Sequence, residues 1–263
     1  MTGDTDQALS RRSALRMAAG AVTAACVDTN GARAPISPIT TARAQGSPSM
    51  AAMIKPTAPD ALLVIDVQYD FLPGGALAVK DGDQVIAPIN ALAQKFDKIV
   101  LTQDWHTKDH ISFASSHAGK KPFGTTLMPY GTQVLWPNHC VQGSRGAMLS
   151  EALEINPAQL IIRKGYHAGT DSYSAFMEAD GKTSTGLAGY LRERGVKRVF
   201  CAGLATDFCV AWTALDAIKA GFEAAVIEDA SRGIDTMGSL AAAWKNMTAA
   251  GVARLRADMI LKA

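Results

Sequence analysis

The sequence predicts a three-layer α/β/α domain around a six-stranded, mostly parallel, doubly wound sheet. From residue 61 onward, short apolar runs alternate with amphipathic, helix-like segments, which is the order typical of a parallel sheet. The apolar runs are nearly continuous, as expected for strands that are covered on both faces. The chain has 263 residues, of which 48% are hydrophobic and 19% are charged, enough for one sizeable core.

The expected elements follow one another in a regular order along the chain. Strands are expected at residues 61–67, 98–102, 159–163, 198–203, 223–229 and, from a less apolar pattern, 252–256. Helices are expected between them, at residues 83–96, 145–154, 184–194, 207–220 and 237–250. Gly195 and Gly221 follow two of these helices directly, as glycine commonly does at a helix C-terminus.

Residues 103–143 break this alternation. The segment shows little helical or strand periodicity, yet it contains four of the five histidines and two of the four tryptophans. Segments of this length without regular structure are uncommon inside a compact domain and are often functional. Since ligands of open parallel sheets bind beyond the carboxyl ends of the strands, we expect the functional residues there.

Three chemically useful residues stand at the ends of three expected strands. Asp66 ends the first strand, Lys164 follows the third, and Cys209 follows the fourth at the start of a helix, where the helix N-terminus would favour a thiolate. Taken singly, each has an ordinary structural explanation: a turn aspartate, a solvated lysine and a core cysteine. Because parallel strands end at one edge of the sheet, the three can converge into a nucleophilic site.

A second set of residues has the spacing of a metal site. Asp104 and His106 are two residues apart, so they point the same way in an extended segment, and His139 completes a set of one carboxylate and two imidazoles. Such a set suits Zn²⁺ or Fe²⁺ and leaves positions open for water or substrate. Scattered loop histidines are the alternative, and His110 is a spare histidine that serves as a ligand, as a support or as neither.

Several sequence segments together resemble a known family. VIDVQYDF, DWH, WPNHCVQGSRGA, RKG followed by DSYSAF, and GLATDFCV occur in this order across residues 61–229. On these motifs the chain resembles the nicotinamidases of the isochorismatase-like hydrolase superfamily. The resemblance implies that fold and an amidohydrolase that converts nicotinamide to nicotinate and ammonia through a cysteine thioester. It also implies activity on pyrazinamide and a divalent metal, Zn or Fe with Mn as an alternative, that orients the pyridine ring.

The resemblance further implies roles for individual residues. The catalytic residues would be Asp66, Lys164 and Cys209. The metal ligands would be Asp104, His106 and His139. The backbone N–H groups of Ala205 and Cys209 would form the oxyanion hole, next to a cis peptide bond between Leu204 and Ala205. The substrate contacts would be Phe71, Trp136, Tyr173 and Leu204, and ordinary core packing is the alternative for Phe71 and Trp136.

Three other functions are compatible with parts of the sequence. The chain can be another metal-containing amide hydrolase of the same superfamily, a catalytically silent ligand-binding protein, or a redox protein that uses Cys201 and Cys209. The metal ligands argue against relatives of the superfamily that lack a metal site, such as isochorismatases, and the intact set of three catalytic residues argues against the silent binding protein. For the third, one cysteine lies on a buried strand, so a disulfide is geometrically doubtful, and the cysteine spacing indicates no disulfide framework.

Residues 1–50 differ from the rest and are expected to be an export leader, with the hydrolase domain at residues 51–263. Arg11 and Arg12 precede a weakly apolar run that is too short to span a bilayer and is typical of a twin-arginine signal. The expected location is the periplasm, and a lipoprotein attached through Cys26 and a cytoplasmic enzyme with a disordered tail are the alternatives. The net charge of +2 indicates neither a nucleic-acid nor a membrane partner, so the expected partners are a small-molecule substrate and the export machinery, with oligomerisation left open.

Overall fold

The computed structural model describes residues 53–154 and 156–263. The leader expected at residues 1–50 therefore lies outside the described residues, and with it Arg11, Arg12 and Cys26. Within the described part of the chain, no helix is long and apolar enough to cross a membrane.

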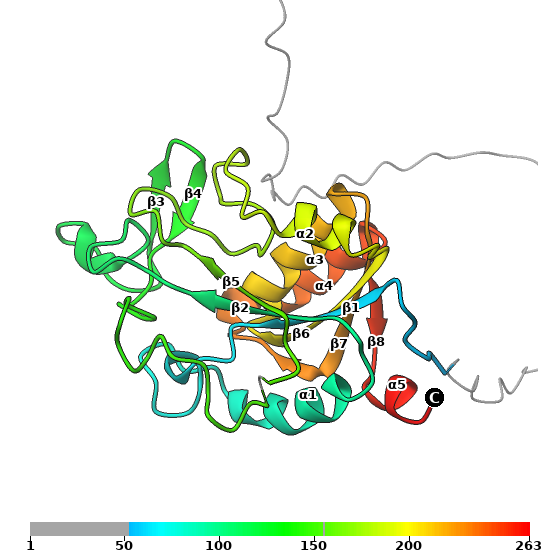
Figure 1. Ribbon diagram of the computed structural model, residues 1–263. Helices are drawn as coiled ribbons and strands as arrows, with labels where there is room; N and C mark the ends of the chain where they lie inside the picture. The colour runs from blue at the N-terminus through cyan, green and yellow to red at the C-terminus, as the bar shows by residue number, and fades with distance from the viewer. Residues whose placement is uncertain (1–52, 155) are drawn as a thin grey trace, which may run out of the picture. The chain divides into compact units, whose positions relative to one another are not determined.

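A six-stranded sheet forms the centre of the domain (Figure 1). Its strands are β1 (Asp60–Ile65), β2 (Ile99–Asp104), β5 (Leu160–Lys164), β6 (Arg198–Leu204), β7 (Glu223–Arg232) and β8 (Ala253–Leu255). They lie in the order β5-β2-β1-β6-β7-β8, and every neighbouring pair is parallel. All six predicted strands are confirmed with ends shifted by a few residues, and the sheet is entirely parallel.

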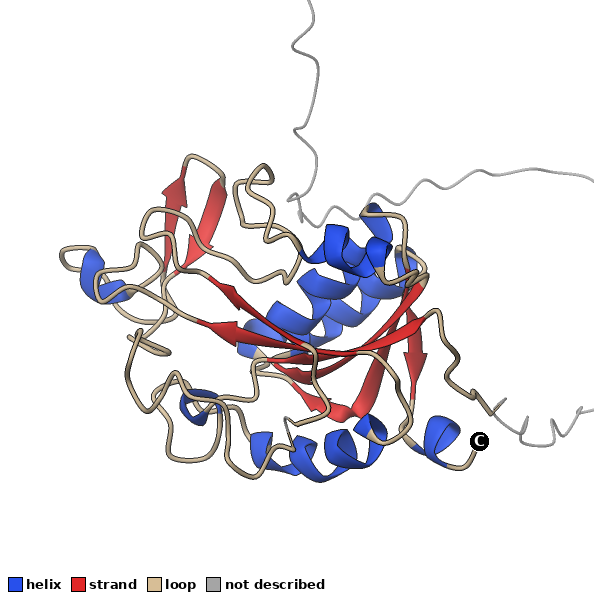
Figure 2. Ribbon diagram, viewed as in Figure 1, coloured by secondary structure: helices blue, strands red, loops and turns tan. Residues whose placement is uncertain are grey.

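Helices cover both faces of this sheet (Figures 1 and 2). On one face lie α1 (Ile86–Ala93) and α5 (Asp258–Leu261); on the other lie α2 (Leu187–Glu193), α3 (Ala211–Lys219) and α4 (Ser239–Ala249). Successive residues of a strand point to opposite faces, and β1 accordingly sends Leu62 and Val64 into one hydrophobic cluster and Leu63 and Ile65 into the other. The predicted three-layer architecture is confirmed.

Two predictions about the connecting segments need correction. Residues 145–154, predicted as a helix, form turns. The backbone carbonyl groups that would accept hydrogen bonds within a helix accept them from distant side chains instead. Gln68 donates to the Ala147 carbonyl oxygen, and Asn90 donates to that of Ala152. Residues 103–143, which show little strand periodicity, nevertheless contain an antiparallel hairpin of two short strands, β3 (Thr125–Met128) and β4 (Gly131–Val134).

The strand order reverses between β1 and β6. From β1 the chain adds β2 and then β5 on one side, and it later returns to add β6 on the other side. In open parallel sheets, ligands bind beyond the carboxyl ends of the strands at this point. Gly203 lets the two strands approach closely there, since its φ is +122° and a Cβ on it would collide with the carbonyl oxygen of Ile65.

Candidate active site

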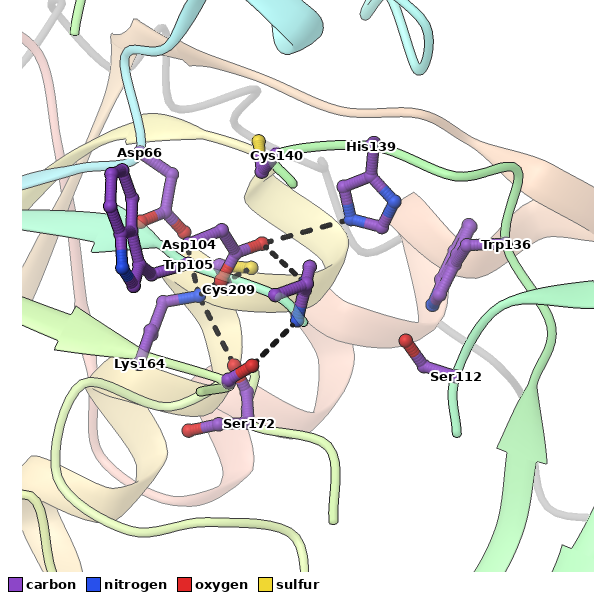
Figure 3. A network of polar contacts seen from close by, with 12 residues as sticks. Asp66, Asp104, Trp105, Ser112, Trp136, His139, Cys140, Lys164, Ser172 and Cys209 are labelled. Carbon is purple, nitrogen blue, oxygen red and sulfur yellow. Dashed lines mark hydrogen bonds and ion pairs between the residues drawn. The ribbon is translucent and has the colours of Figure 1, made fainter. Parts of the chain in front are cut away.

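Three buried side chains meet beyond the carboxyl ends of the sheet (Figure 3). Lys164 Nζ lies 2.8 Å from Asp66 Oδ2 and 3.4 Å from Cys209 Sγ. The same ammonium group donates to the carbonyl oxygen of Ser172 at 3.1 Å and contacts Asp104 Oδ1. The structure therefore brings together the three residues that stand at the strand ends in the sequence.

Each of the three is held by a different element. Asp66 follows β1 directly, with a left-handed φ of 48°, and its Oδ1 accepts a hydrogen bond of 2.6 Å from the Thr102 hydroxyl. Lys164 is the last residue of β5. Cys209 lies in a single π-helical turn, Thr206–Val210, between β6 and α3. Such turns are frequent at functional sites.

Burial and charge together set the protonation of this cluster. Burial lowers the pKa of Lys164, but the carboxylates of Asp104 and Asp66 outweigh it and raise that pKa well above its ordinary value. Burial raises the pKa of Asp66, and Lys164 only partly opposes the effect. Burial also raises the pKa of the Cys209 thiol well above its ordinary value, again against the opposing charge of Lys164. The lysine is therefore charged and the cysteine is a thiol.

A helix N-terminus was expected to favour a thiolate at Cys209, and in this structure the burial of the residue opposes that effect. The residue sits in the π-helical turn before α3 and is buried beside two carboxylates, which disfavour a further negative charge. A base has to remove the proton, and an Asp66 oxygen lies within 4.8 Å of Cys209 Sγ. Asp66 Oδ2 is close to Lys164, yet it has no hydrogen-bond donor in good geometry among the described residues, so it is available to accept that proton.

The predicted metal ligands also converge. Asp104 Oδ2 lies 3.5 Å from His106 Nε2 and 3.8 Å from His139 Nε2, and the three ligand atoms are all within 4.8 Å of one another. The Nδ1 atoms of the two histidines face backbone carbonyl oxygens, of Gly165 at 2.9 Å and of Pro137 at 2.8 Å. A carbonyl only accepts, so each Nδ1 carries the hydrogen and each Nε2 presents its lone pair toward Asp104. This donor set fits a divalent metal.

The sequence neighbours of these ligands explain why the loops fold as they do. Gly165 has a left-handed φ of +65°, and a Cβ on it would lie 2.7 Å from His106 Nδ1, so a glycine is required against that ring. Asp70 accepts a hydrogen bond of 2.7 Å from the backbone N–H of Cys140 and thereby anchors the loop next to His139. Each contact acts on the position of a histidine that is predicted to bind the metal.

Cys209 and the predicted metal ligands share one cavity. Its wall is formed by Phe71, Leu77, Asp104, His106, Trp136, His139, Asp171, Tyr173, Ala205, Phe208, Cys209 and Ile234. Three of the four expected substrate contacts, Phe71, Trp136 and Tyr173, are therefore at the cavity. The fourth, Leu204, does not line the cavity: its side chain is buried in a hydrophobic core cluster, beside Gly82.

The expected oxyanion hole has its backbone at this cavity as well. Ala205 and Cys209 both line it, and the peptide bond between Leu204 and Ala205 is cis. His110 lies behind the ligands, with its ring centroid 4.3 Å from that of His106 and its Nδ1 2.7 Å from Ser112 Oγ.

Some residues of the cavity were not identified from the sequence. Asp171 and Phe208 stand inside the quoted motifs DSYSAF and GLATDFCV, so their neighbours in those motifs were a usable signal. Leu77 and Ile234 come from loops without a pattern that would single them out. The cysteines expected to be unpaired are free in the described part of the chain: Cys140, Cys201 and Cys209.

Comparisons with known proteins give the following matches. The family model described as Isochorismatase domain matches residues 60–258. The nicotinamidase of Acinetobacter baylyi is 61% identical over 201 residues, which cover 76% of this chain and 94% of that protein. A solved nicotinamidase and pyrazinamidase of Acinetobacter baumanii is 59% identical, with a TM-score of 0.76 and coverage of 76% and 97%. A pyrazinamidase of Pyrococcus horikoshii, solved in complex with zinc, is 38% identical, with a TM-score of 0.62 and coverage of 75% and 99%.

Proposed function

This chain belongs to the isochorismatase domain family, and on that premise we propose that it hydrolyses nicotinamide to nicotinate and ammonia. One observation carries the proposal: a buried Asp66, Lys164 and Cys209 adjoin a set of three metal-ligating side chains in a single cavity. The identity with a nicotinamidase over most of the chain supports the substrate. The matched pyrazinamidases support pyrazinamide, whose carboxamide is carried on a similar aromatic ring, as a second substrate.

The reaction begins with a proton transfer inside the cluster. Asp66 takes the proton of the Cys209 thiol, and Sγ attacks the carboxamide carbon to form a C–S bond. Lys164 stays charged, 3.4 Å from the sulfur, and balances the negative charge that the transfer places there. The raised pKa of Asp66 suits a group that must hold this proton during the step.

The intermediate then loses ammonia. The carbonyl oxygen becomes negative as the bond forms, and the backbone N–H groups of Ala205 and Cys209 are the donors assigned to it. Asp66 returns its proton to the departing nitrogen, the C–N bond breaks, and a thioester remains. A water molecule, deprotonated by Asp66, hydrolyses the thioester to release nicotinate and restore the thiol.

Asp104, His106 and His139 would hold a divalent metal, which when bound supplies a Lewis acid for a ring nitrogen or for a water beside it. Zinc or iron(II) is proposed, with manganese as the alternative, and the zinc complex of the matched pyrazinamidase supports zinc. The chain's own aromatic residues complete the placement, since Phe71 and Trp136 line the cavity where a flat ring would lie.

A purified-protein assay tests this function. The wild-type protein is incubated with nicotinamide, pyrazinamide and benzamide, and ammonia release is measured before and after removal of metal by a chelator and after metal is returned. We expect hydrolysis of the first two amides, loss with the chelator and recovery with added metal. Hydrolysis of an unrelated amide with none of nicotinamide would instead assign the chain to another amide hydrolase of the family.

The location of the enzyme is a separate proposal. We infer export to the periplasm by the twin-arginine route, with the leader at residues 1–50 as the signal. The arginine pair Arg11 and Arg12 supports it, as does the weakly apolar run that follows. A route that exports the protein already folded also suits an enzyme with a catalytic thiol, because an unfolded chain would expose its cysteines to an oxidising compartment.

A further inference from the structure

Two side-chain nitrogen atoms lie within hydrogen-bond distance of the Tyr173 hydroxyl group at the cavity wall. Trp136 Nε1 and Gln133 Nε2 each lie 3.0 Å from Tyr173 Oη. An indole N–H and an amide NH₂ only donate hydrogen bonds, so the Tyr173 hydroxyl gives its own hydrogen to neither group. Its oxygen accepts from Trp136, whereas the two hydrogens of the Gln133 amide are shared among three acceptors, because Nε2 also lies close to Asp171 Oδ2 and to the Val134 carbonyl oxygen. No hydrogen bond donated by Tyr173 Oη occurs within residues 53–154 and 156–263. The hydrogen is therefore free for a ligand in the cavity.

The orientation of Gln133 depends on Asp171. Gln133 Nε2 lies 2.6 Å from Asp171 Oδ2 and 2.7 Å from the Val134 carbonyl oxygen, while Gln133 Oε1 faces the Tyr130 hydroxyl at 3.2 Å. A carboxylate only accepts, so it holds the NH₂ end of the amide toward itself and toward Tyr173. A reversed amide would place its oxygen against a carboxylate and a carbonyl with no hydrogen between them.

We propose that Asp171 is a positioning residue which, through Gln133, holds the Tyr173 hydroxyl as a hydrogen-bond donor toward the ligand. The identity of that ligand rests on the proposed function: an aromatic carboxamide, or its product acid, offers acceptors on the ring and on the carbonyl group. Asp171 and Gln133 are each 2% exposed, so their polar groups depend on hydrogen bonds within the protein and not on solvent. Gln133 lies in β4, and the hairpin within residues 103–143 thus contacts Tyr173 of the cavity wall.

Two other roles for Asp171 compete with this one. Its neighbour Ser172 accepts a hydrogen bond from Lys164, so Asp171 can support the catalytic lysine through the loop. Its carboxylate also lies within 4.8 Å of ring nitrogens of His106 and His110, so it can serve the metal site. Neither of these roles passes through the Tyr173 hydroxyl, and a test that removes that hydroxyl separates them.

The test is a double-mutant cycle with Asp171→Asn, Tyr173→Phe and the double variant. For each we measure kcat and KM for nicotinamide, the affinity for nicotinate by calorimetry, and metal content. We expect each single variant to lose about tenfold in kcat/KM and in nicotinate affinity, mainly through KM, as for one lost hydrogen bond. The double variant is expected to be no worse than Tyr173→Phe alone. Gln133→Met, which removes the link, is expected to repeat the result of Asp171→Asn.

The other outcomes overturn the proposal. A further loss on adding Asp171→Asn to Tyr173→Phe would show that Asp171 acts elsewhere, and loss of metal in Asp171→Asn would place it at the metal site. If Asp171→Asn does not fold, Gln133→Met alone decides, and full activity of that variant refutes the link. A wild-type protein that binds nicotinate with this coupling but releases no ammonia would refute the proposed function and leave the inference standing. A wild-type protein that does not bind nicotinate would refute both.

Discussion

The carbonyl oxygen of Gly165 lies 2.9 Å from His106 Nδ1, while the Cα of the same glycine packs against that ring. One residue thus fixes both the tautomer and the position of a metal-ligating histidine. The contact also places the metal ligand immediately beside the catalytic lysine, since Gly165 directly follows Lys164 in the chain.

Gly165→Ala is therefore expected to weaken the metal site. The new Cβ would lie 2.7 Å from His106 Nδ1, and the left-handed φ of +65° would be strained for alanine. We expect a loss of roughly 10- to 100-fold in metal affinity, as for other contacts that orient ligands. Titration with metal measures it, and Gly169→Ala, where a Cβ meets nothing within 4 Å, is the matched control. Equal affinity in the two variants would contradict the assigned role.

Cys209→Ala is expected to abolish hydrolysis of nicotinamide while leaving the fold intact. Loss of a covalent nucleophile should reduce kcat by at least about 10³-fold. Ammonia release and the thermal unfolding temperature are measured together, and Cys201→Ala, which removes another buried thiol from the same part of the chain, is the control. If Cys209→Ala retained activity within about tenfold of wild type, the nucleophile would have to be another residue.

His106→Ala is expected to lose metal and to raise KM strongly. The variant removes one of three converging ligands, so metal content after dialysis should fall below about a tenth of one equivalent. Asp104→Ala should do the same, with an added effect on kcat because Asp104 also contacts Lys164. Elemental analysis gives the metal content. His167→Ala is the control, since this half-exposed histidine pairs with Glu178 away from the ligand set. Full metal content in both ligand variants would disprove the site.

The ion pair at the opposite end of the sheet makes stability depend on pH. Burial raises the pKa of Asp60, but hydrogen bonds from Arg198 at 2.8 and 2.9 Å and from Thr57 outweigh it and hold the pKa below its ordinary value. A lowered carboxyl pKa contributes stability above the ordinary pKa, and this contribution is lost as pH falls through the folded-state pKa.

Arg198→Met is accordingly expected to destabilise the fold near neutral pH but not in acid. We expect a loss of about 1–2 kcal/mol at about pH 7, discounted for screening because the Arg198 side chain is 31% exposed, and a difference from wild type that shrinks toward about pH 3. Denaturant unfolding over this pH range measures it. Lys219→Met removes an exposed pair with Asp216 and should change stability by less than about 0.5 kcal/mol. A difference that stays constant down to acid pH would show that packing, not charge, is lost.

Replacement of Arg11 and Arg12 by lysine is expected to leave the protein in the cytoplasm. The change keeps the charge, so it removes only the arginine pair that the twin-arginine route requires. Cell fractionation with N-terminal sequencing measures location and processing. Arg33→Lys with Arg43→Lys, in the same leader, is the matched control. Export of the Arg11 and Arg12 variant at the wild-type level, or a wild-type protein that stays cytoplasmic with its N-terminus intact, would contradict the proposal.

Much of the fold and of the site can be predicted from the sequence, for physical reasons. A strand buried on both faces must be continuously apolar, which makes the six strands visible, and parallel strands end at one edge, which predicts that Asp66 and Lys164 meet. Asp104 and His106 could be predicted as ligands because DWH places these two donors on one side of an extended segment.

Features that depend on three-dimensional packing could not be predicted from the sequence. Residues 145–154, wrongly predicted as a helix, have suitable apolar spacing. Their carbonyl groups accept hydrogen bonds from residues distant in sequence, among them Gln68, Gln103 and Asn90, which no local pattern reports. The protonation of Cys209 depends on burial beside two carboxylates, which no local pattern reports. Asp171 becomes significant only once Gln133, from a hairpin with no clear periodicity, is seen to lie against it.

The position of Lys164 in the sheet has a consequence for how the enzyme fails. β5 is one of the two edge strands of the sheet, hydrogen-bonded to β2 alone among the described strands, and its Ile161 is 44% exposed. Strands at an edge with few buried contacts detach by local opening at a lower free energy than the whole domain. A detached β5 would carry the catalytic ammonium away from Asp66 and Cys209 while β1, β6 and β7 kept their core. On warming, inactivation should therefore begin before global unfolding, and amide hydrogen exchange should show β5 losing protection before the central strands β1, β6 and β7.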